Sequence, residues 1–276
     1  MSTILRYAAA LTGLGLLLNF PVLAQRAIFV QETAAGADFR MENLAIPSYD
    51  IVPGGPGKDG IPAIDAPQFT DARHDQWMND EDIVIGLVHN GVAKAYPLRI
   101  LNYHEVVNDE FDGEAVAVTY SPLCGSAMAF ATDKGDYERW QLAVSGLLYN
   151  NNPLFFDRKT ESLWSQLSAE AVSGPVAGAS LDQLPVLRTT WAEWRAQHPE
   201  TLLLSRETGF HRNYEVDAYE YYVETDRLMF PVNHIDKRLP VKTLVLGVEV
   251  DGVFKAYPYA TLPRNAAHTT EDIVNG

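Results

Sequence analysis

The sequence feature that most constrains the fold is an eighteen-residue frame that occurs twice, in residues 84–101 and again in residues 245–262. The shared frame is Val-x-Gly-x-x-x-x-Gly-Val-x-Lys-Ala-Tyr-Pro-x-x-x-Leu, and nine of its eighteen positions are identical without a gap. Internal repeats of this kind indicate duplicated structural units. The glycines suit turns, and the Tyr-Pro pair suits a strand that ends where proline begins a helix. The frame therefore predicts a duplicated strand–turn–strand–helix unit, and this structural role explains Lys94 and Lys255 better than a functional one.

Short β-type runs separated by turn residues occupy much of the chain around and after the first copy. The Asn90-Gly91 and Asp112-Gly113 pairs are typical hairpin turns between such runs. Helices are predicted over 98–107, after a proline, and over 190–197, where a Thr and a Glu three residues apart form a capping-box pair. The sequence therefore predicts an α+β, β-rich fold with a mostly antiparallel sheet. The predicted strands are residues 83–89, 92–96, 115–120, 142–149, 153–157 and 201–205.

The second copy of the frame is shorter than the first. Residues 271–276 echo only the beginning of the segment that follows the first copy, and no partner strand comes after them. We therefore expect a second repeat that is truncated at the C-terminus. Both copies are expected to lie in a single domain that spans residues 25–276.

The first 24 residues have the pattern of a secretory signal peptide. Arg6 supplies a positive charge, residues 8–18 are apolar but too few to cross a bilayer, and 22–24 end in small residues typical of a cleavage site. We place the mature start at Gln25 and expect a periplasmic or secreted protein. Beyond this segment, no stretch is long and apolar enough to predict a membrane span.

Charge and cysteine content exclude several classes of protein. The chain has 36 acidic and 21 basic residues, a formal net charge of −15, and offers no basic face for nucleic acid. Its single cysteine, Cys124, excludes an intrachain disulfide framework and a zinc site made only of cysteines. The remaining partners are a small-molecule ligand, a metal ion or another protein.

Seven phrases of the sequence belong together: DGIPAID at 59–65, AYPL at 95–98, NYHEVVND at 102–109, TYSPLCG at 119–125, SGLLYN at 145–150, DRKTESLWSQ at 157–166 and RLP at 238–240. They resemble the secreted bacterial and archaeal domain-of-unknown-function family 3179 (DUF3179). Members of this family often carry a Cys-Pro-Leu-Cys or Cys-Pro-Leu-Thr phrase, and this chain has Ser121 where that phrase begins. A redox or metal role that needs two cysteines is therefore excluded here. The resemblance implies no activity.

Candidate site residues cluster in the predicted helix and strand after the first frame. If these two elements pack together, the imidazole of His104, the thiol of Cys124 and the thioether of Met128 converge, and such soft ligands suit copper in an oxidising compartment. The turn around Cys124 also presents backbone N–H groups to a ligand. The candidate ligand-binding residues are His104, Glu105, Asn108, Tyr120, Ser121, Cys124, Ser126, Asp157 and Arg158.

Three functional hypotheses remain open. The first is an exported protein that binds a small ligand or metal ion near His104 and Cys124. The second is a periplasmic hydrolase or redox enzyme that uses Cys124, with His104 as base, or the carboxylates of Asp157 and Glu161. The third is a structural or partner-binding envelope protein, in which Cys124 is a small buried residue and His104 hydrogen-bonds a turn.

Overall fold

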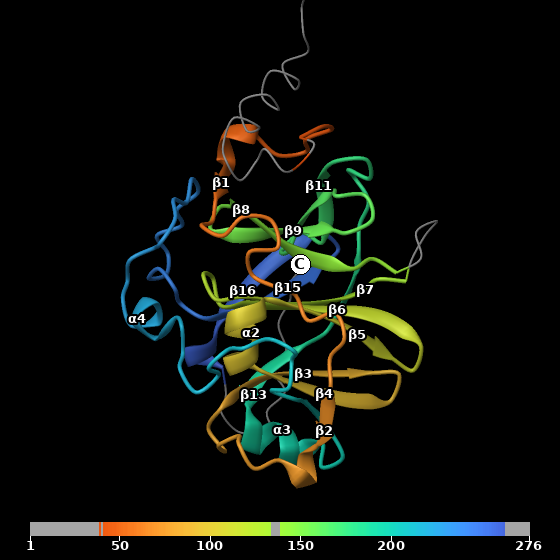
Figure 1. Cartoon of the computed structure of the whole chain (residues 1–276). Coiled ribbons are helices and arrows are strands. Elements are labelled where there is room, and N and C mark those ends of the chain that lie inside the picture. The colour runs from red at the N-terminus through yellow and green to blue at the C-terminus, as the bar shows by residue number, and fades with distance from the viewer. Residues whose placement is uncertain (1–38, 40, 134–138, 263–276) are drawn as a thin grey trace, which may run out of the picture.

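The computed structural model describes residues 39, 41–133 and 139–262, and these residues form three stacked sheets and a separate hairpin (Figure 1). The upper sheet has the order β1 (Ile51–Pro53), β8 (Leu142–Tyr149), β9 (Asn152–Asp157), β10 (Leu163–Ser165) and β11 (Glu170–Ser173). The middle sheet has the order β12 (Asp182–Leu184), β7 (Ser126–Ala131), β6 (Glu114–Ser121) and β5 (Val106–Phe111). The lower sheet has the order β13 (Leu187–Thr190), β3 (Ile83–His89), β4 (Val92–Pro97), β14 (Leu202–Leu204) and β2 (Phe69–Asp71).

The expected fold class is confirmed. The described residues are β-rich, and among the named strands only β14 and β4 pair in parallel. Helices are few and short. They are α2 (Leu98–His104), α3 (Trp191–Gln197) and α4 (Glu220–Val223), with 3-10 turns at Ser48–Asp50, Ala72–His74 and Tyr259–Thr261.

The middle sheet is buried on both faces. Its alternate residues Val106, Ala117 and Phe130 join the core that lies against the upper sheet. The residues between them, such as Val107 and Val118, join the core that lies against the lower sheet. Because both faces of β6 are covered, its sequence is almost continuously apolar and small instead of alternating with polar residues.

The predicted hairpin and the Thr190 N-cap are confirmed, the reciprocal half of the capping box is replaced by a Thr189–Glu193 hydrogen bond, and one helix boundary is wrong. β3 and β4 flank the Asn90-Gly91 turn as expected, and the Thr190 hydroxyl accepts a hydrogen bond from the Glu193 backbone N–H at 3.3 Å. The helix predicted over 98–107 ends at His104, because Glu105 adopts a left-handed conformation with φ of 58°. The β-branched residues that follow enter β5 instead.

The second copy of the frame also forms a hairpin, β15 (Val245–Val250) with β16 (Val253–Pro258). Its pairing matches the first copy, since Val245 faces Pro258 as Val84 faces Pro97. Where the first copy continues into α2, the second continues into a 3-10 turn, Tyr259–Thr261.

The described helices are all too short or too polar to cross a membrane. The predicted signal peptide, residues 1–24, and the final residues 271–276 lie outside the described residues.

Candidate functional site

The loop between β6 and β7 holds Cys124 at the end of the middle sheet. Gly125 closes the turn with φ of +64°, a conformation that glycine adopts without strain. The Leu123 carbonyl accepts hydrogen bonds from the Asn151 amide at 3.2 Å and the Tyr222 hydroxyl at 2.9 Å. The turn is therefore fixed from two sides, yet Cys124 itself is exposed. The interpretation of Cys124 as a small buried residue is wrong.

A chain of polar side chains orients the Cys124 thiol. The Asn152 amide donates to the Cys124 sulfur at 3.1 Å, and the Ser126 oxygen lies 2.9 Å from that sulfur. The Ser126 hydroxyl donates to Oε1 of Gln166 at 2.6 Å, so the thiol proton points to the Ser126 oxygen. Gln166 is fixed in turn by donating to the Thr119 hydroxyl at 3.0 Å. This network holds the sulfur in one place, with an amide donor beside it.

Glu105 lies next to β6 and is the most unusual charged residue of this region. Its backbone carbonyl accepts the Tyr120 N–H at 2.8 Å, which continues the pairing of β5 with β6. The residue is only 6% exposed, and among the described residues its carboxyl group has no hydrogen-bond or ion-pair partner, so burial alone perturbs it. Burial raises the pKa of Glu105 to about 8, because the charged carboxylate is poorly solvated there. The raised pKa favours the protonated form near neutral pH, and in this form the carboxyl group is able to donate a hydrogen bond.

Two tyrosines connect Glu105 electrostatically to the Cys124 turn. Burial is the main cause that raises the pKa of Tyr120 to about 12, with an opposing effect of Arg188 and smaller contributions from Cys124, Asp217 and Glu105. Burial likewise raises the pKa of Tyr219 to about 12, with Glu105 as the next contributor. Both hydroxyls thus stay protonated, and both lie within the electrostatic reach of Glu105. Tyr219 comes from the segment before α4, whose Asp217 accepts a hydrogen bond from Asn102 of α2 at 2.9 Å.

Ser121 ends β6 and pairs across the hairpin with Ser126. Its hydroxyl is buried and has no hydrogen-bond partner among the described residues. A buried polar group without a partner loses its interaction with water and gains nothing in return. An unsatisfied hydroxyl and an unpartnered carboxyl thus lie at the same end of the middle sheet.

The surroundings of His104 favour a structural role for this residue. Its side chain is fully buried, with Nδ1 2.8 Å from the Pro62 carbonyl and Nε2 2.7 Å from the Tyr214 hydroxyl. Burial lowers the pKa of His104, which favours the neutral ring. Since the carbonyl accepts only, Nδ1 carries the proton and Nε2 accepts from Tyr214. No described hydrogen bond joins His104 to Cys124, so the structure does not bring the predicted pair into contact.

The candidate metal ligands do not form a cluster. Met128 packs against the apolar core between the upper and middle sheets. Both nitrogens of His104 are already used in hydrogen bonds. Within the described part of the chain, no group of three or more His, Cys, Asp or Glu residues is arranged to hold a metal ion.

The remaining candidates hold the upper sheet and its loops together. Asp157 is fully buried, and its oxygens accept hydrogen bonds from the Trp164 indole at 3.0 Å and from the Thr160 hydroxyl at 2.7 Å. Glu161 lies 2.6 Å from Lys58. Arg158 pairs with Asp59 at 2.9 Å and with Asp65 at 3.4 Å, and Asn108 bonds both the backbone N–H and the carbonyl of Leu142.

Sequence reasoning missed three residues of this region. They are Asn152 at the start of β9, Gln166 directly after β10 and Tyr219 directly before α4. They come from three separate elements, so no local spacing links them to Cys124. The available signal was indirect, since polar residues inside buried strands need partners.

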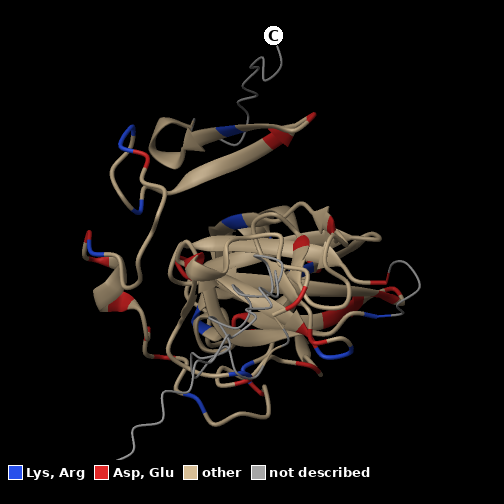
Figure 2. Cartoon of the chain, turned by 90° about the horizontal axis from the view of Figure 1, so that it is seen from above, with Lys and Arg blue, Asp and Glu red and all other residues tan. Residues whose placement is uncertain are grey.

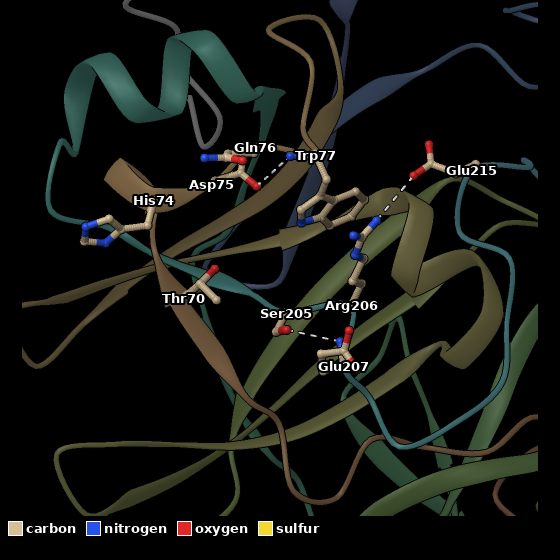
Figure 3. Close-up of a pocket in the computed structure, with 9 residues that line it drawn as sticks. All are labelled: Thr70, His74, Asp75, Gln76, Trp77, Ser205, Arg206, Glu207 and Glu215. Atoms are coloured by element: carbon tan, nitrogen blue, oxygen red, sulfur yellow. Dashed lines mark hydrogen bonds and ion pairs between the residues drawn. The ribbon is translucent and has the colours of Figure 1, made fainter.

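A hollow elsewhere on the molecule is lined by exposed, mutually paired groups (Figure 3). It lies beside β2 and β14, and Arg206 reaches across it to Glu215 at 3.8 Å, with both side chains more than half exposed. Exposed ion pairs of this kind are weak. The hollow includes neither Glu105 nor Cys124.

Comparison with known proteins identifies a family without an assigned function. No curated protein matches the chain. No solved structure matches it either. The family described as "Protein of unknown function (DUF3179)" matches residues 58–275, which is most of the chain. The chain therefore belongs to the DUF3179 family.

Proposed function

We propose that this chain is an exported protein that binds a small molecule at the Cys124 turn. The observation that carries the proposal is the combination of an exposed, oriented thiol with a buried, unpartnered carboxyl group at one end of the middle sheet. The export part rests on the signal-peptide pattern of residues 1–24.

The groups near Cys124 favour a ligand that accepts hydrogen bonds. Glu105, Tyr120 and Tyr219 all have raised pKa values, so at neutral pH each carries a proton that it can donate. Such donors discriminate between ligands, because a ligand that displaces their water without accepting a hydrogen bond leaves them unpaired. A small molecule with carbonyl, carboxyl or hydroxyl oxygens is therefore the chemical class that fits.

Cys124 makes the test specific, since it is the only cysteine of the chain. Iodoacetamide labelling of the folded protein, followed by mass spectrometry, reports on this position alone. We would measure the labelling rate with and without each member of a panel of small organic acids, sugars and aldehydes. We expect at least one compound to slow labelling several-fold in a saturable manner.

Three variants separate a real site from simple shielding. Glu105→Gln and Asn152→Ala are expected to weaken the protection by that compound, whereas Glu207→Gln, an exposed carboxyl outside this region, retains it. If no compound in the panel slows labelling, or if all three variants behave alike, the proposed binding site is wrong. Circular dichroism of each variant confirms that it is folded.

A further inference from the structure

The β15–β16 hairpin has no strand on either outer edge among the described residues. Figure 2 shows it standing apart from the three stacked sheets, to which an extended chain segment joins it. It also exposes large apolar side chains: Leu246 is 42% exposed and Phe254 is 76% exposed. Uncovered strand edges and apolar side chains are features that proteins normally cover.

The first copy of the same frame is covered on both edges. β13 pairs antiparallel with β3, and β14 pairs with β4. In that copy Val84 and Ala95 are fully buried. The corresponding Ala256 of the second copy is exposed. The first copy thus shows how other elements of the chain cover this frame.

The closest contact between the first copy and the elements that cover it is made by an indole ring and a glycine. Trp194 of α3 lies so close to Gly86 that a Cβ atom on Gly86 would be 2.2 Å from a ring carbon. Gly86 pairs with Ala95, and the second copy keeps this pair of small residues as Gly247 and Ala256. A Cβ atom on Gly247 would meet nothing within 4 Å. The second copy therefore has the same pair of small residues, and the space above Gly247 is open to an aromatic ring.

We propose that the β15–β16 hairpin is a docking surface for a segment of another polypeptide. This segment pairs antiparallel with the outer edge of β15 around Gly247 and continues into a short helix that places a tryptophan ring on Gly247. Strand addition supplies main-chain hydrogen bonds, and the aromatic anchor supplies specificity. The partner's chemistry is that of β13 and α3, an extended run of β-formers followed by Trp-x-x-Trp.

A labelled peptide tests the proposal directly. The probe is a fluorescein-labelled peptide of residues 187–197, which carries the sequence of β13 and α3, and binding to the full chain is followed by fluorescence anisotropy. We expect saturable binding, with an affinity for the peptide that is at least tenfold lower in Gly247→Leu. The φ of Gly247 is not in the left-handed region, so the leucine causes no backbone strain. A peptide with Trp194→Ala is expected to bind at least tenfold more weakly.

The matched control is Val253→Thr, which alters an exposed residue on the opposite face of the hairpin and leaves binding unchanged. Absence of saturable binding at millimolar peptide overturns the proposal. Equal binding to Gly247→Leu also overturns it, because the peptide would then be exchanging with β13 on β3. Sedimentation that shows a dimer lost in Gly247→Leu would identify a second copy of the chain as the occupant instead.

Discussion

The repeated frame allows one substitution to be tested in two settings of the same chain. Gly86 and Gly247 hold equivalent positions, but only Gly86 lies under Trp194. In Gly86→Ala, the new Cβ atom would lie 2.2, 2.3 and 2.6 Å from three ring carbons, against an ordinary contact of 3.4–4 Å. The ring must therefore move by about 1 Å to reach an ordinary contact.

That movement has a definite energetic consequence. Trp194 is almost fully buried, and its indole N–H donates to the Thr201 hydroxyl at 2.9 Å. Overpacking costs about 1–3 kcal/mol, and a weakened buried hydrogen bond costs about 1 kcal/mol. The lower entropy of the unfolded alanine chain offsets about 0.4–1 kcal/mol. We expect Gly86→Ala to lower the free energy of unfolding by about 2–3 kcal/mol, and Gly247→Ala to leave it unchanged or slightly higher.

Urea unfolding followed by tryptophan fluorescence measures both variants under one set of conditions. We expect the midpoint to fall in Gly86→Ala without a change in slope. A loss below about 0.5 kcal/mol in Gly86→Ala, the level of ordinary surface substitutions, would refute the packing argument. An equal loss of unfolding free energy in Gly247→Ala would refute the claim that the space above Gly247 is open.

Three further predictions concern buried charges. Because the pKa of Glu105 is raised to about 8 in the folded chain, the folded state loses stability as pH rises from about 4.5 to 8; Glu105→Gln is expected to flatten this dependence in unfolding curves measured across that range. Lys94→Met removes the partner of the buried Asp109 carboxylate, 2.9 Å away, and is expected to cost about 3–5 kcal/mol by urea unfolding, whereas a double variant with Asp109→Leu recovers much of the loss. Asp157→Ala leaves the buried Trp164 indole N–H unpaired and is expected to cost at least about 2 kcal/mol and to shift the tryptophan emission spectrum.

The local elements of this fold are visible in the sequence because local chemistry decides them. Asn90-Gly91 specifies a hairpin turn, and a Thr N-cap with a Glu three residues later specifies the start of α3. The arrangement of the lower sheet is not local. β14 lies between β4 and β2, and this order depends on packing around Trp194 and Leu203.

The candidate site shows the same division. The residue types around Cys124 are readable from the sequence, and so is its place in a tight turn. The isolation of Glu105 is not readable, since it results from a helix that ends one turn earlier than its apolar pattern predicts. Likewise, a hydrogen-bonding role for His104 is among the alternatives that the sequence offers, but its partners Pro62 and Tyr214 lie 42 and 110 residues away and cannot be identified from local spacing.

The double burial of the middle sheet also has a consequence for how the molecule opens. Amide protons on β6 are shielded from solvent by a sheet on each side, so their exchange with deuterium requires disruption of the whole stack. The Cys124 loop is thus anchored to a strand that is expected to exchange slowly. Tyr219 lies in a segment outside the stack and packs on the cluster of Leu123, Leu148 and Tyr222, so its amide proton is expected to exchange faster than those of β6 although it borders the same loop.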